Sequence, residues 1–156
     1  APDGREYDEP ARPGVYALNV DNGEYVWQAP AGKDVCLGRP GCYPGYSAAI
    51  SVTSDFVLAG SNEGWLRAFD IDNGEVLWEF DTTQPFAAVD GRRAQGGSIG
   101  GGQAPLIVGG RLILNSGYAF AGKMPGNALL VLKLPASEKS VSAEFDAQVL
   151  LESAAK

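Results

Sequence analysis

The chain repeats one of its own segments, and this repeat constrains the fold more than any other feature. Residues 14–27 recur as residues 64–78. Each copy has an alternating strand, then Asp-Asn-Gly, then a second strand that ends in tryptophan. This pattern predicts a hairpin whose Asn-Gly pair takes positive φ angles in a two-residue turn. Three pairs of identical residues share a spacing of 51 positions: Ala17 and Ala68, Gly23 and Gly74, and Trp27 and Trp78. A period of this length is typical of solenoids and propellers.

Two further strands precede the second copy and complete a four-stranded unit. The sequence predicts strands at 47–52, 55–60, 64–71 and 75–80, joined by turns. Four short antiparallel strands in succession make up one blade of a β-propeller. We expect the tryptophan that ends each copy to pack between blades rather than to contact a ligand, because the repeat fixes its position and its flat ring buries well between stacked sheets.

A third unit follows, with strands expected at 104–108, 111–116 and 129–134 and no Asn-Gly turn or tryptophan after them. The strand count is therefore two, four and three, which makes an all-β partial propeller of about two and a half four-stranded antiparallel blades. Because propellers close with about four to eight blades, we expect a longer parent polypeptide to supply the rest, with this chain as its C-terminal part. We assign residues 1–134 to the propeller and 135–156 to a tail, expected to be a short helix or a disordered end.

Composition excludes several classes of function. The net charge of −7 comes with no clustered stripe of Lys and Arg, so we expect no nucleic-acid partner. No apolar run approaches the roughly 18 residues of a membrane span. The chain has no histidine, so it cannot by itself assemble a Ser-His-Asp or Cys-His nucleophile system, or a histidine-ligated zinc or haem.

The two cysteines, Cys36 and Cys42, are close enough in the sequence to pair. Gly38, Pro40 and Gly41 let the short loop between them fold back, so a disulfide is sterically allowed. A disulfide would imply an oxidising compartment such as the periplasm. Two free thiols are the alternative.

Blade topology determines which connections share a face. In a four-strand meander, the connections between blades and those between the second and third strands emerge on one side of the molecule. Here these are the long connections, at 28–46, 81–103, 1–13 and 117–127. Connections longer than about 12 residues are usually functional or disordered, so we expect a binding surface on this face.

One of these connections is rich in glycine between Gly96 and Gly102. Its backbone N–H groups could approach an anion, and the two arginines before it could bind carboxylates. Alternatively, the glycines only permit tight passage toward the propeller axis. Asp90 is the candidate for a carboxylate base or a calcium ligand. The candidate cofactor-binding residues are Arg92, Arg93, Ser98, Gln103, Asn115 and Tyr118.

These motifs resemble those of a known family. The Ala-Phe-Asp-x-Asp-x-Gly-x-x-x-Trp pattern at 68–78 resembles the tryptophan-docking repeat of propellers that bind pyrroloquinoline quinone (PQQ). More narrowly, the segments at 42–49, 96–102, 115–118 and 124–130 are similar to the C-terminal blades of polyvinyl-alcohol dehydrogenase-like quinoproteins.

The resemblance covers about residues 14–134 and carries functional implications. It implies an eight-bladed, periplasmic or secreted parent that oxidises alcohols with PQQ and calcium and passes electrons to a cytochrome. We do not expect the isolated chain to be active. Two features depart from related enzymes: Cys36 and Cys42 do not match the adjacent-cysteine disulfide of methanol-dehydrogenase-type proteins, and no catalytic aspartate maps residue by residue.

Two other functions are compatible with such a propeller. One is a non-catalytic scaffold that binds partner proteins, like the outer-membrane assembly lipoprotein that shares the repeat, although such scaffolds generally keep their inter-blade loops short. The other is a propeller that binds polymers or glycans on exposed aromatic rings. The candidate rings are Tyr7, Tyr43, Tyr46 and Phe86.

Overall fold

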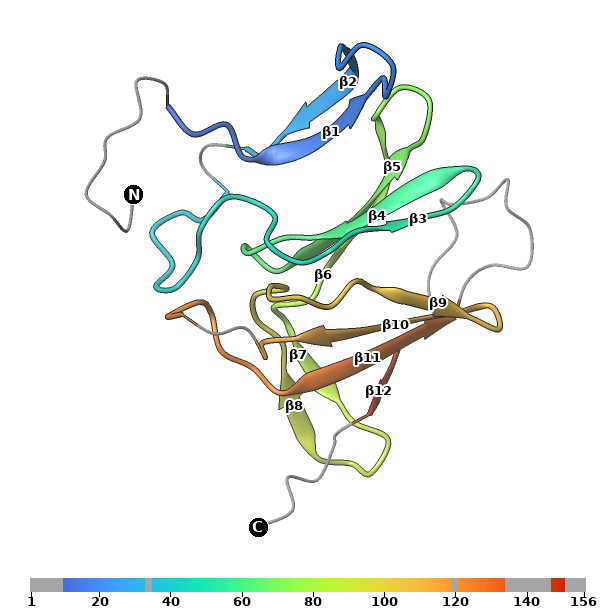
Figure 1. Cartoon of the computed structure of the whole chain (residues 1–156). Helices are drawn as coiled ribbons and strands as arrows, with labels where there is room; N and C mark the ends of the chain where they lie inside the picture. The colour runs from blue at the N-terminus through green and yellow to red at the C-terminus, as the bar shows by residue number, and fades with distance from the viewer. Residues whose placement is uncertain (1–9, 33–34, 119–120, 134–146, 151–156) are drawn as a thin grey trace.

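The computed structural model describes residues 10–32, 35–118, 121–133 and 147–150, and the regular structure in these ranges consists of β-strands alone. Figure 1 shows successive sheets, from β1–β2 through β3–β6 to β9–β12. This arrangement confirms the all-β class and the partial propeller. No helix in the described ranges is long and apolar enough to cross a membrane. The strands are β1 (Gly14–Leu18), β2 (Tyr25–Pro30), β3 (Ser51–Val52), β4 (Phe56–Gly60), β5 (Trp65–Asp70), β6 (Val76–Asp81), β7 (Pro85–Ala87), β8 (Arg93–Gln95), β9 (Leu106–Val108), β10 (Arg111–Ser116), β11 (Ala128–Lys133) and β12 (Ala147–Leu150).

The middle blade is a four-stranded antiparallel meander in the order β3-β4-β5-β6. Both of its faces are buried, because successive residues of β4 point to opposite sides of the sheet. Val57 packs with Val15 and Trp27 of the first hairpin. The next residue, Leu58, joins a second core with Leu112 of the last blade. The middle blade is therefore packed between its two neighbours.

The two copies of the repeat fold alike, including a register shift after Ala17 and after Ala68. Their turns are longer than the predicted two-residue form. In both turns only the glycine has a positive φ, 74° at Gly23 and at Gly74, and Gly74 N donates to Asp70 O at 3.0 Å. The Asp70 carboxylate also accepts hydrogen bonds from the two amides that follow Ile71 in the sequence, which stabilises the longer turn.

The last blade has four strands, not the three predicted. β12 pairs antiparallel with β11, with Gln148 opposite Val131, so the sheet order is β12-β11-β10-β9. This strand was not predicted, since neither an Asn-Gly turn nor a tryptophan marks it in the sequence. The expectation of a helix or a disordered end is therefore wrong at 147–150, whereas 134–146 and 151–156 lie outside the described residues.

A small hairpin, β7–β8, lies within the connection between the middle and last blades. No strands are predicted from the sequence over 81–103, yet β7 pairs antiparallel with β8. The Asp90-Gly91 pair lies at its tip and is a common hairpin signal. Phe86 of β7 stacks on Phe80 of β6, with 6.2 Å between ring centroids. Ala94 of β8 joins the core that contains Leu112 of the last blade. The hairpin is therefore packed against both the middle and the last blade.

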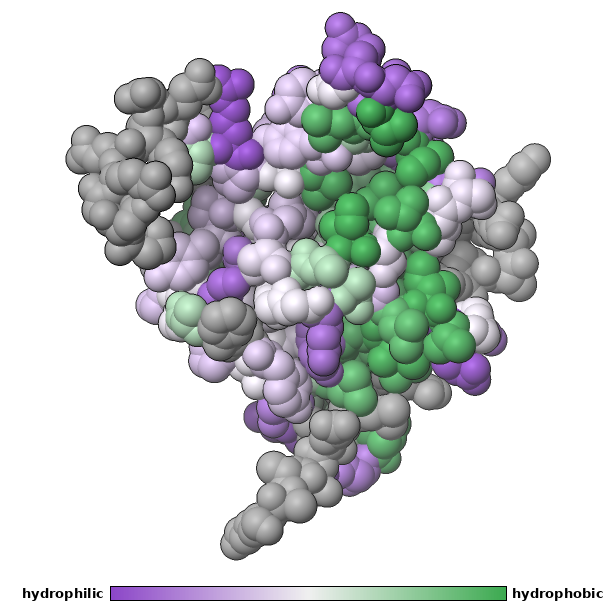
Figure 2. All heavy atoms as spheres, viewed as in Figure 1, coloured by the Kyte–Doolittle hydropathy of each residue, from purple (hydrophilic) through white to green (hydrophobic). Residues whose placement is uncertain are grey.

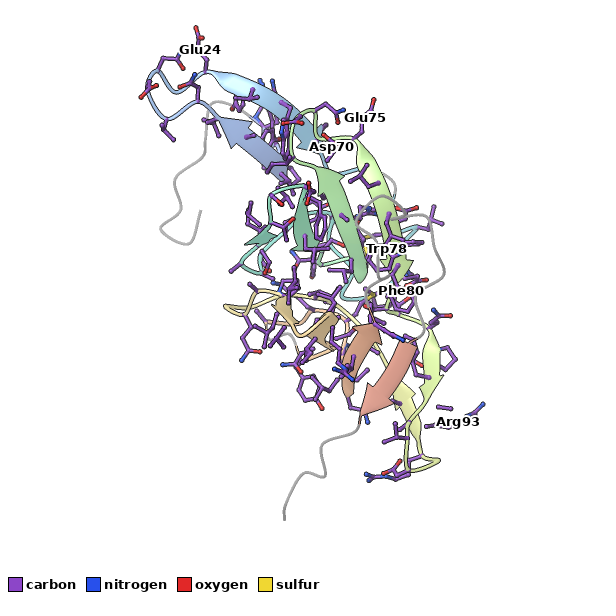
Figure 3. All side chains as sticks on the ribbon, turned by 90° about the vertical axis from the view of Figure 1, so that its right-hand side faces the viewer. Glu24, Asp70, Glu75, Trp78, Phe80 and Arg93 are labelled. Atoms are coloured by element: carbon purple, nitrogen blue, oxygen red, sulfur yellow. A yellow bond between two sulfur atoms is a disulfide. The ribbon has the colours of Figure 1, made fainter. Side chains whose placement is uncertain are left out.

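Trp27 packs between blades, as the repeat predicts. Its side chain is buried, and a Cβ built at Gly74 would come within 2.5 Å of the indole ring. The equivalent residue of the second copy, Trp78, stacks on Phe80 with 5.9 Å between ring centroids, and Figure 3 shows the two rings side by side. Trp27 thus links the first hairpin to the turn of the middle blade.

The first strands of the two complete blades expose apolar side chains. Figure 2 shows hydrophobic residues gathered over the strands at the right of the view, whereas the connections at the left are more polar. Contiguous exposed apolar surface usually marks an interaction site. The exposed side chains on or beside these strands include Ile50, Val52, Leu106 and Val108.

Candidate functional site

The long connections lie against one another on one face, as blade topology predicts. Ile99 N donates to Ser61 O at 2.9 Å, and Ser98 N donates to Met124 O at 3.0 Å. These bonds join three segments: the turn between β4 and β5, the glycine-rich segment, and the connection between β10 and β11. The face is therefore a continuous surface built from several connections.

Three polar side chains from three of these segments converge at one point. Lys123 Nζ donates to Ser47 Oγ at 2.5 Å, and Ser47 Oγ donates to Asn62 Oδ1 at 2.8 Å. Ser47 precedes β3, Asn62 lies between β4 and β5, and Lys123 lies between β10 and β11. This group, here called the Lys123 cluster (Ser47, Asn62 and Lys123), places a cation beside an amide and a hydroxyl.

Gly100 lets the backbone come close to the point at which the Lys123 cluster meets. A Cβ at this position would lie 2.9 Å from Lys123 Nζ, and 3.0 Å from both Asn62 Oδ1 and Ser47 Oγ. Any larger residue would therefore occupy the centre of the cluster. By contrast, a Cβ at Gly102 would have nothing within 4 Å.

Elsewhere in the glycine-rich segment, the missing side chains let the backbone pass close to its neighbours. A Cβ at Gly96 would lie 1.5 Å from Thr82 O, and one at Gly97 would lie 2.4 Å from Met124 O. Gly96 and Gly97 permit tight passage of the backbone past its neighbours, and Gly100 permits close packing of the backbone against the Lys123 cluster.

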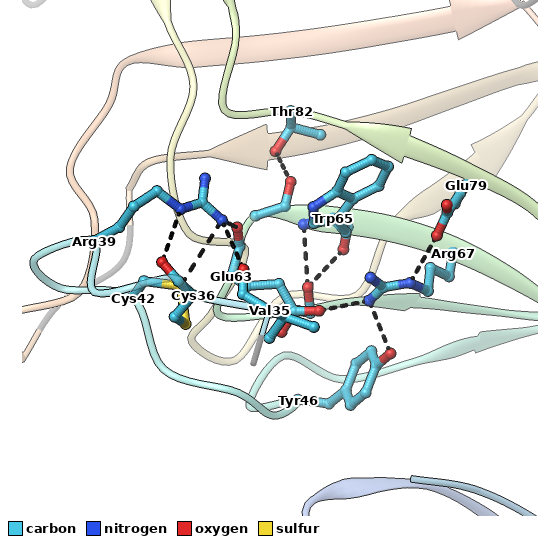
Figure 4. A network of polar contacts seen from close by, with 12 residues as sticks. Val35, Cys36, Arg39, Cys42, Tyr46, Glu63, Trp65, Arg67, Glu79 and Thr82 are labelled. Atoms are coloured by element: carbon cyan, nitrogen blue, oxygen red, sulfur yellow. Dashed lines mark hydrogen bonds and ion pairs between the residues drawn. A yellow bond between two sulfur atoms is a disulfide. The ribbon is translucent and has the colours of Figure 1, made fainter. Parts of the chain in front are cut away.

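A buried ion pair holds the turn that carries Asn62. Arg67 Nη1 donates to Glu63 Oε1 at 2.7 Å, with 14% of the Arg67 side chain and 1% of the Glu63 side chain exposed. Arg67 also donates to Glu79 Oε2 at 3.1 Å and to Tyr46 OH at 3.2 Å (Figure 4). Within the described part of the chain Glu63 Oε2 has no hydrogen-bond partner. The Glu63 carboxylate therefore depends on Arg67 for charge compensation.

Tyr46 is half-buried beside this ion pair. Burial raises the pKa of Tyr46 above its ordinary value of 10.0, and the nearby Arg67 guanidinium opposes the increase only in part. The phenol therefore stays protonated at neutral pH and accepts the hydrogen bond from Arg67.

The aromatic rings expected as polymer-stacking platforms are only partly available. Tyr46 is bonded to Arg67 and Phe86 stacks on another ring, so both contribute to the fold. Tyr43 is exposed on the connection face. Tyr7 lies outside the described residues.

Cys36 and Cys42 form the expected disulfide, with an S–S distance of 2.08 Å. Arg39 lies inside the loop that the disulfide closes, and its guanidinium contacts Glu63 O and Thr83 Oγ1, each at 3.5 Å. Figure 4 shows this guanidinium between the loop and the middle blade. The disulfide-closed loop is thus anchored beside the turn that carries the buried ion pair.

Four of the predicted cofactor-binding residues line one pocket of about 710 Å³. Asn115 Nδ2 donates to Gln103 Oε1 at 2.9 Å, and Tyr118 OH donates to Asn127 O at 3.3 Å. The Ser98 hydroxyl is occupied within the protein, since it donates to a backbone carbonyl at 2.5 Å and accepts from a backbone amide at 3.1 Å. The structure therefore brings Ser98, Gln103, Asn115 and Tyr118 together around one hollow.

The rest of the pocket wall combines the glycine-rich segment with apolar residues of the strands. Leu106, Ile113 and Leu129 line it. Ile113 points away from the core that Leu112 enters, because successive strand residues alternate between faces. The pocket thus lies on the outer face of the last blade, and its walls resemble the faces that the middle blade buries against its neighbours.

Asp90, Arg92 and Arg93 are on the β7–β8 hairpin and do not line this pocket. Figure 3 shows Arg93 on that hairpin, away from the stacked blades. Arg92 donates to the Asp90 carboxylate from its backbone N at 3.0 Å and from its Nε at 2.6 Å. These hydrogen bonds hold the pKa of Asp90 below its ordinary value. Asp90 is therefore ionised at neutral pH and paired within its own hairpin.

The described residues offer no ready-made metal centre. In the ranges that the structure covers, no group of three or more Asp, Glu, Cys or His side chains is placed to hold an ion.

The Lys123 cluster is not predicted from the sequence. One feature of the sequence does point to Lys123, because it is the only charged residue of the 117–127 connection. Blade topology places this connection on the face where we expect a binding surface. Ser47 and Asn62 gave no comparable signal, since short polar residues are common at turns and strand ends.

Parts of known proteins are similar in sequence to this chain. A family model described as outer membrane protein assembly factor BamB matches residues 11–133. A polyvinylalcohol dehydrogenase from Pseudomonas sp. is 41% identical over 119 residues, which cover 75% of this chain and 18% of that protein. A polyvinylalcohol dehydrogenase from Sphingopyxis sp. is 37% identical over 69% of this chain and 17% of its own length. A 1-butanol dehydrogenase (quinone) from Thauera butanivorans is 30% identical over 66% of this chain and 17% of its own length. The chain thus spans less than a fifth of the length of each of these relatives.

Proposed function

This chain belongs to the PQQ-repeat family described as outer membrane protein assembly factor BamB, and from that premise we propose that it forms consecutive blades of a PQQ-dependent alcohol dehydrogenase. The relatives named polyvinylalcohol dehydrogenase support an alcohol as the substrate class. The observation that carries the proposal is the Lys123 cluster, where a cation, an amide and a hydroxyl meet on the connection face beside Gly100.

The Lys123 cluster suits one part of PQQ, a planar quinone that carries carboxylate groups. A lysine ammonium forms strong, charge-assisted hydrogen bonds with carboxylate oxygens. Because Gly100 has no side chain, no Cβ crowds Lys123 Nζ or blocks the approach of such an oxygen to it. When bound, PQQ supplies the oxidising chemistry. In this proposal Lys123 binds and orients the cofactor, while Ser47 and Asn62 hold the ammonium in place.

Calcium is part of the proposal through the family resemblance alone. The described residues supply no acidic cluster for it. Its ligands would come from residues outside the described ranges or from other blades.

The outer face of the last blade supports the presence of further blades. Its apolar walls, at Leu106, Ile113 and Leu129, have the character of a buried inter-blade face. We place another blade of the parent protein against this face, in a propeller that the resemblance puts at eight blades. The disulfide supports a periplasmic or secreted location, and a cytochrome is the proposed electron acceptor.

The test uses the complete protein that carries this chain. PQQ is titrated while the cofactor absorption is followed, and alcohol-dependent dye reduction is then measured with calcium present. We expect saturable binding and turnover, with Lys123→Gln weakening PQQ binding about tenfold or more, because a hydrogen bond to a charged group is lost. Lys123→Arg should retain most of the affinity. The proposal fails if the wild-type protein neither binds PQQ nor oxidises any alcohol.

A non-catalytic scaffold is the alternative, and the assembly-factor description of the matching family favours it. The long connections and the Lys123 cluster favour the dehydrogenase. Stable capture of partner proteins by a parent that does not bind PQQ would support the scaffold instead.

A further inference from the structure

The disulfide-closed loop contacts the segment that carries Lys123. Met124 N donates to Gly41 O at 3.0 Å. A Cβ at Gly41 would lie 2.9 Å from both Gly122 O and Met124 N, and 3.0 Å from the carbonyl carbon of Lys123. The loop backbone is therefore pressed against the segment from Gly122 to Met124, on both sides of Lys123.

This segment has a backbone conformation that requires support. Ala121 and Gly122 both have left-handed φ angles, 62° and 73°. A residue other than glycine in this region carries strain that the surroundings must offset. Met124 is buried, and its amide also lies 3.1 Å from Ser98 Oγ. Contacts from Gly41 and Ser98 thus hold the chain immediately after Lys123.

The other side of the loop is anchored to the middle blade. Arg39 contacts the backbone oxygen of Glu63, the residue that follows Asn62, and the hydroxyl of Thr83. The Cys36–Cys42 disulfide joins the two ends of the loop. One covalently closed loop therefore bridges the turn that carries Asn62 and the segment that carries Lys123.

We infer that the Cys36–Cys42 loop is a positioning element for the Lys123 cluster. It sets the separation of Asn62 and Lys123, and through it the affinity of the site for an anionic group such as a carboxylate of PQQ. The loop itself makes no bond to the ligand. This inference rests on the proposed function, because it names the element that tunes the same site.

Two glycines of the loop provide a matched pair of variants. Gly41 and Gly38 have nearly equal positive φ angles, 73° and 75°, so alanine is strained at either position. Only Gly41→Ala would press a side chain into the Lys123 segment, since a Cβ at Gly38 would meet nothing within 4 Å. In the complete protein, we expect Gly41→Ala to weaken PQQ binding about fivefold relative to Gly38→Ala, which is the effect of losing roughly one hydrogen bond.

A double-variant cycle separates positioning from a general loss of structure. In a Lys123→Gln background, Gly41→Ala should change the PQQ dissociation constant by less than about twofold, because the two changes act through one group. An equal loss in both backgrounds would overturn the inference, as would equal affinities for the Gly41→Ala and Gly38→Ala proteins. If Gly41→Ala does not fold, the paired Cys36→Ala and Cys42→Ala protein replaces it in the same cycle, with the same expected results. A wild-type protein that does not bind PQQ would instead overturn the proposed function, and this inference with it.

Discussion

Trp27 Nε1 donates a 2.8 Å hydrogen bond to the carbonyl oxygen of Ile71, a residue 44 positions further along the chain. Ile71 lies in the turn of the middle blade, and the indole ring covers Gly74 of the same turn. The tryptophan that ends one hairpin is thus bound by the turn of the next blade. This interaction links the sequence repeat to the stacking of the sheets.

Replacing Gly74 should test this inter-blade contact. Gly74→Ala would place a Cβ 2.5 Å from the Trp27 ring, whereas Gly23→Ala, at the same φ of 74°, would meet nothing within 4 Å. Both variants carry the strain of a left-handed alanine, about 1 kcal/mol. Gly74→Ala should lose about 1–3 kcal/mol more, because the Trp27 ring must move. Urea unfolding of the complete protein measures both losses, and equal losses would contradict the contact.

The buried Glu63 should make Arg67 costly to remove. Arg67→Met leaves a carboxylate that is 1% exposed without its cation, and we expect a loss of about 3–5 kcal/mol in unfolding free energy. Glu79→Gln should lose less than about 1 kcal/mol, because the Glu79 side chain is 49% exposed. The double variant Glu63→Leu with Arg67→Met should recover most of the stability. Similar losses in the Arg67→Met and Glu79→Gln proteins would show that Glu63 does not depend on Arg67.

The raised pKa of Tyr46 should make the folded protein less stable at alkaline pH. Burial raises the pKa of Tyr46 above 10.0 in the folded state, so the folded protein holds this proton more tightly than the unfolded chain. The resulting contribution is fully present below pH 10, and it is lost as the pH rises through the folded-state pKa. Tyr46→Phe should cost about 1 kcal/mol at neutral pH through the lost hydrogen bond. The variant's free energy of unfolding should also fall less steeply above pH 10 than that of the wild-type protein. Urea unfolding at a series of pH values measures this dependence. The same fall with pH in both proteins would count against this account.

Gly100 should control ligand affinity more than stability. Its added Cβ would meet the flexible ends of Lys123, Asn62 and Ser47, which can move aside at little cost to folding. They would then no longer meet at one point, and PQQ affinity should fall about tenfold. Gly102→Ala is the control, because nothing lies within 4 Å of its Cβ. If titrations give the same dissociation constant for both variants, the Lys123 cluster is not the binding site.

The fold was predictable where a local signal recurred. The Asp-Asn-Gly and tryptophan pattern predicted both hairpins and the place of Trp27, because turn chemistry and aromatic burial act over a few residues. The pattern did not predict the length of the turn. This length depends on hydrogen bonds that the Asp70 carboxylate accepts from two backbone amides of the turn. β12 was missed because its pairing with β11 is a long-range contact without a turn signal.

The site was less predictable than the fold. Blade topology predicts that the long connections share a face, and they do. Four of the predicted residues share a pocket on the outer face of the last blade. Asp90 lies instead on the β7–β8 hairpin, because the Asp90-Gly91 pair turns that hairpin. The Lys123 cluster depends on a contact between Ser47 and Lys123, which are far apart in the sequence. No short sequence pattern predicts such a long-range contact.

A crystal structure of the complete protein with PQQ tests the central claim most directly. We expect the cofactor on the connection face, with a carboxylate or quinone oxygen within about 3.2 Å of Lys123 Nζ. PQQ bound at a different place, with no oxygen in hydrogen-bonding reach of Lys123, would contradict the account.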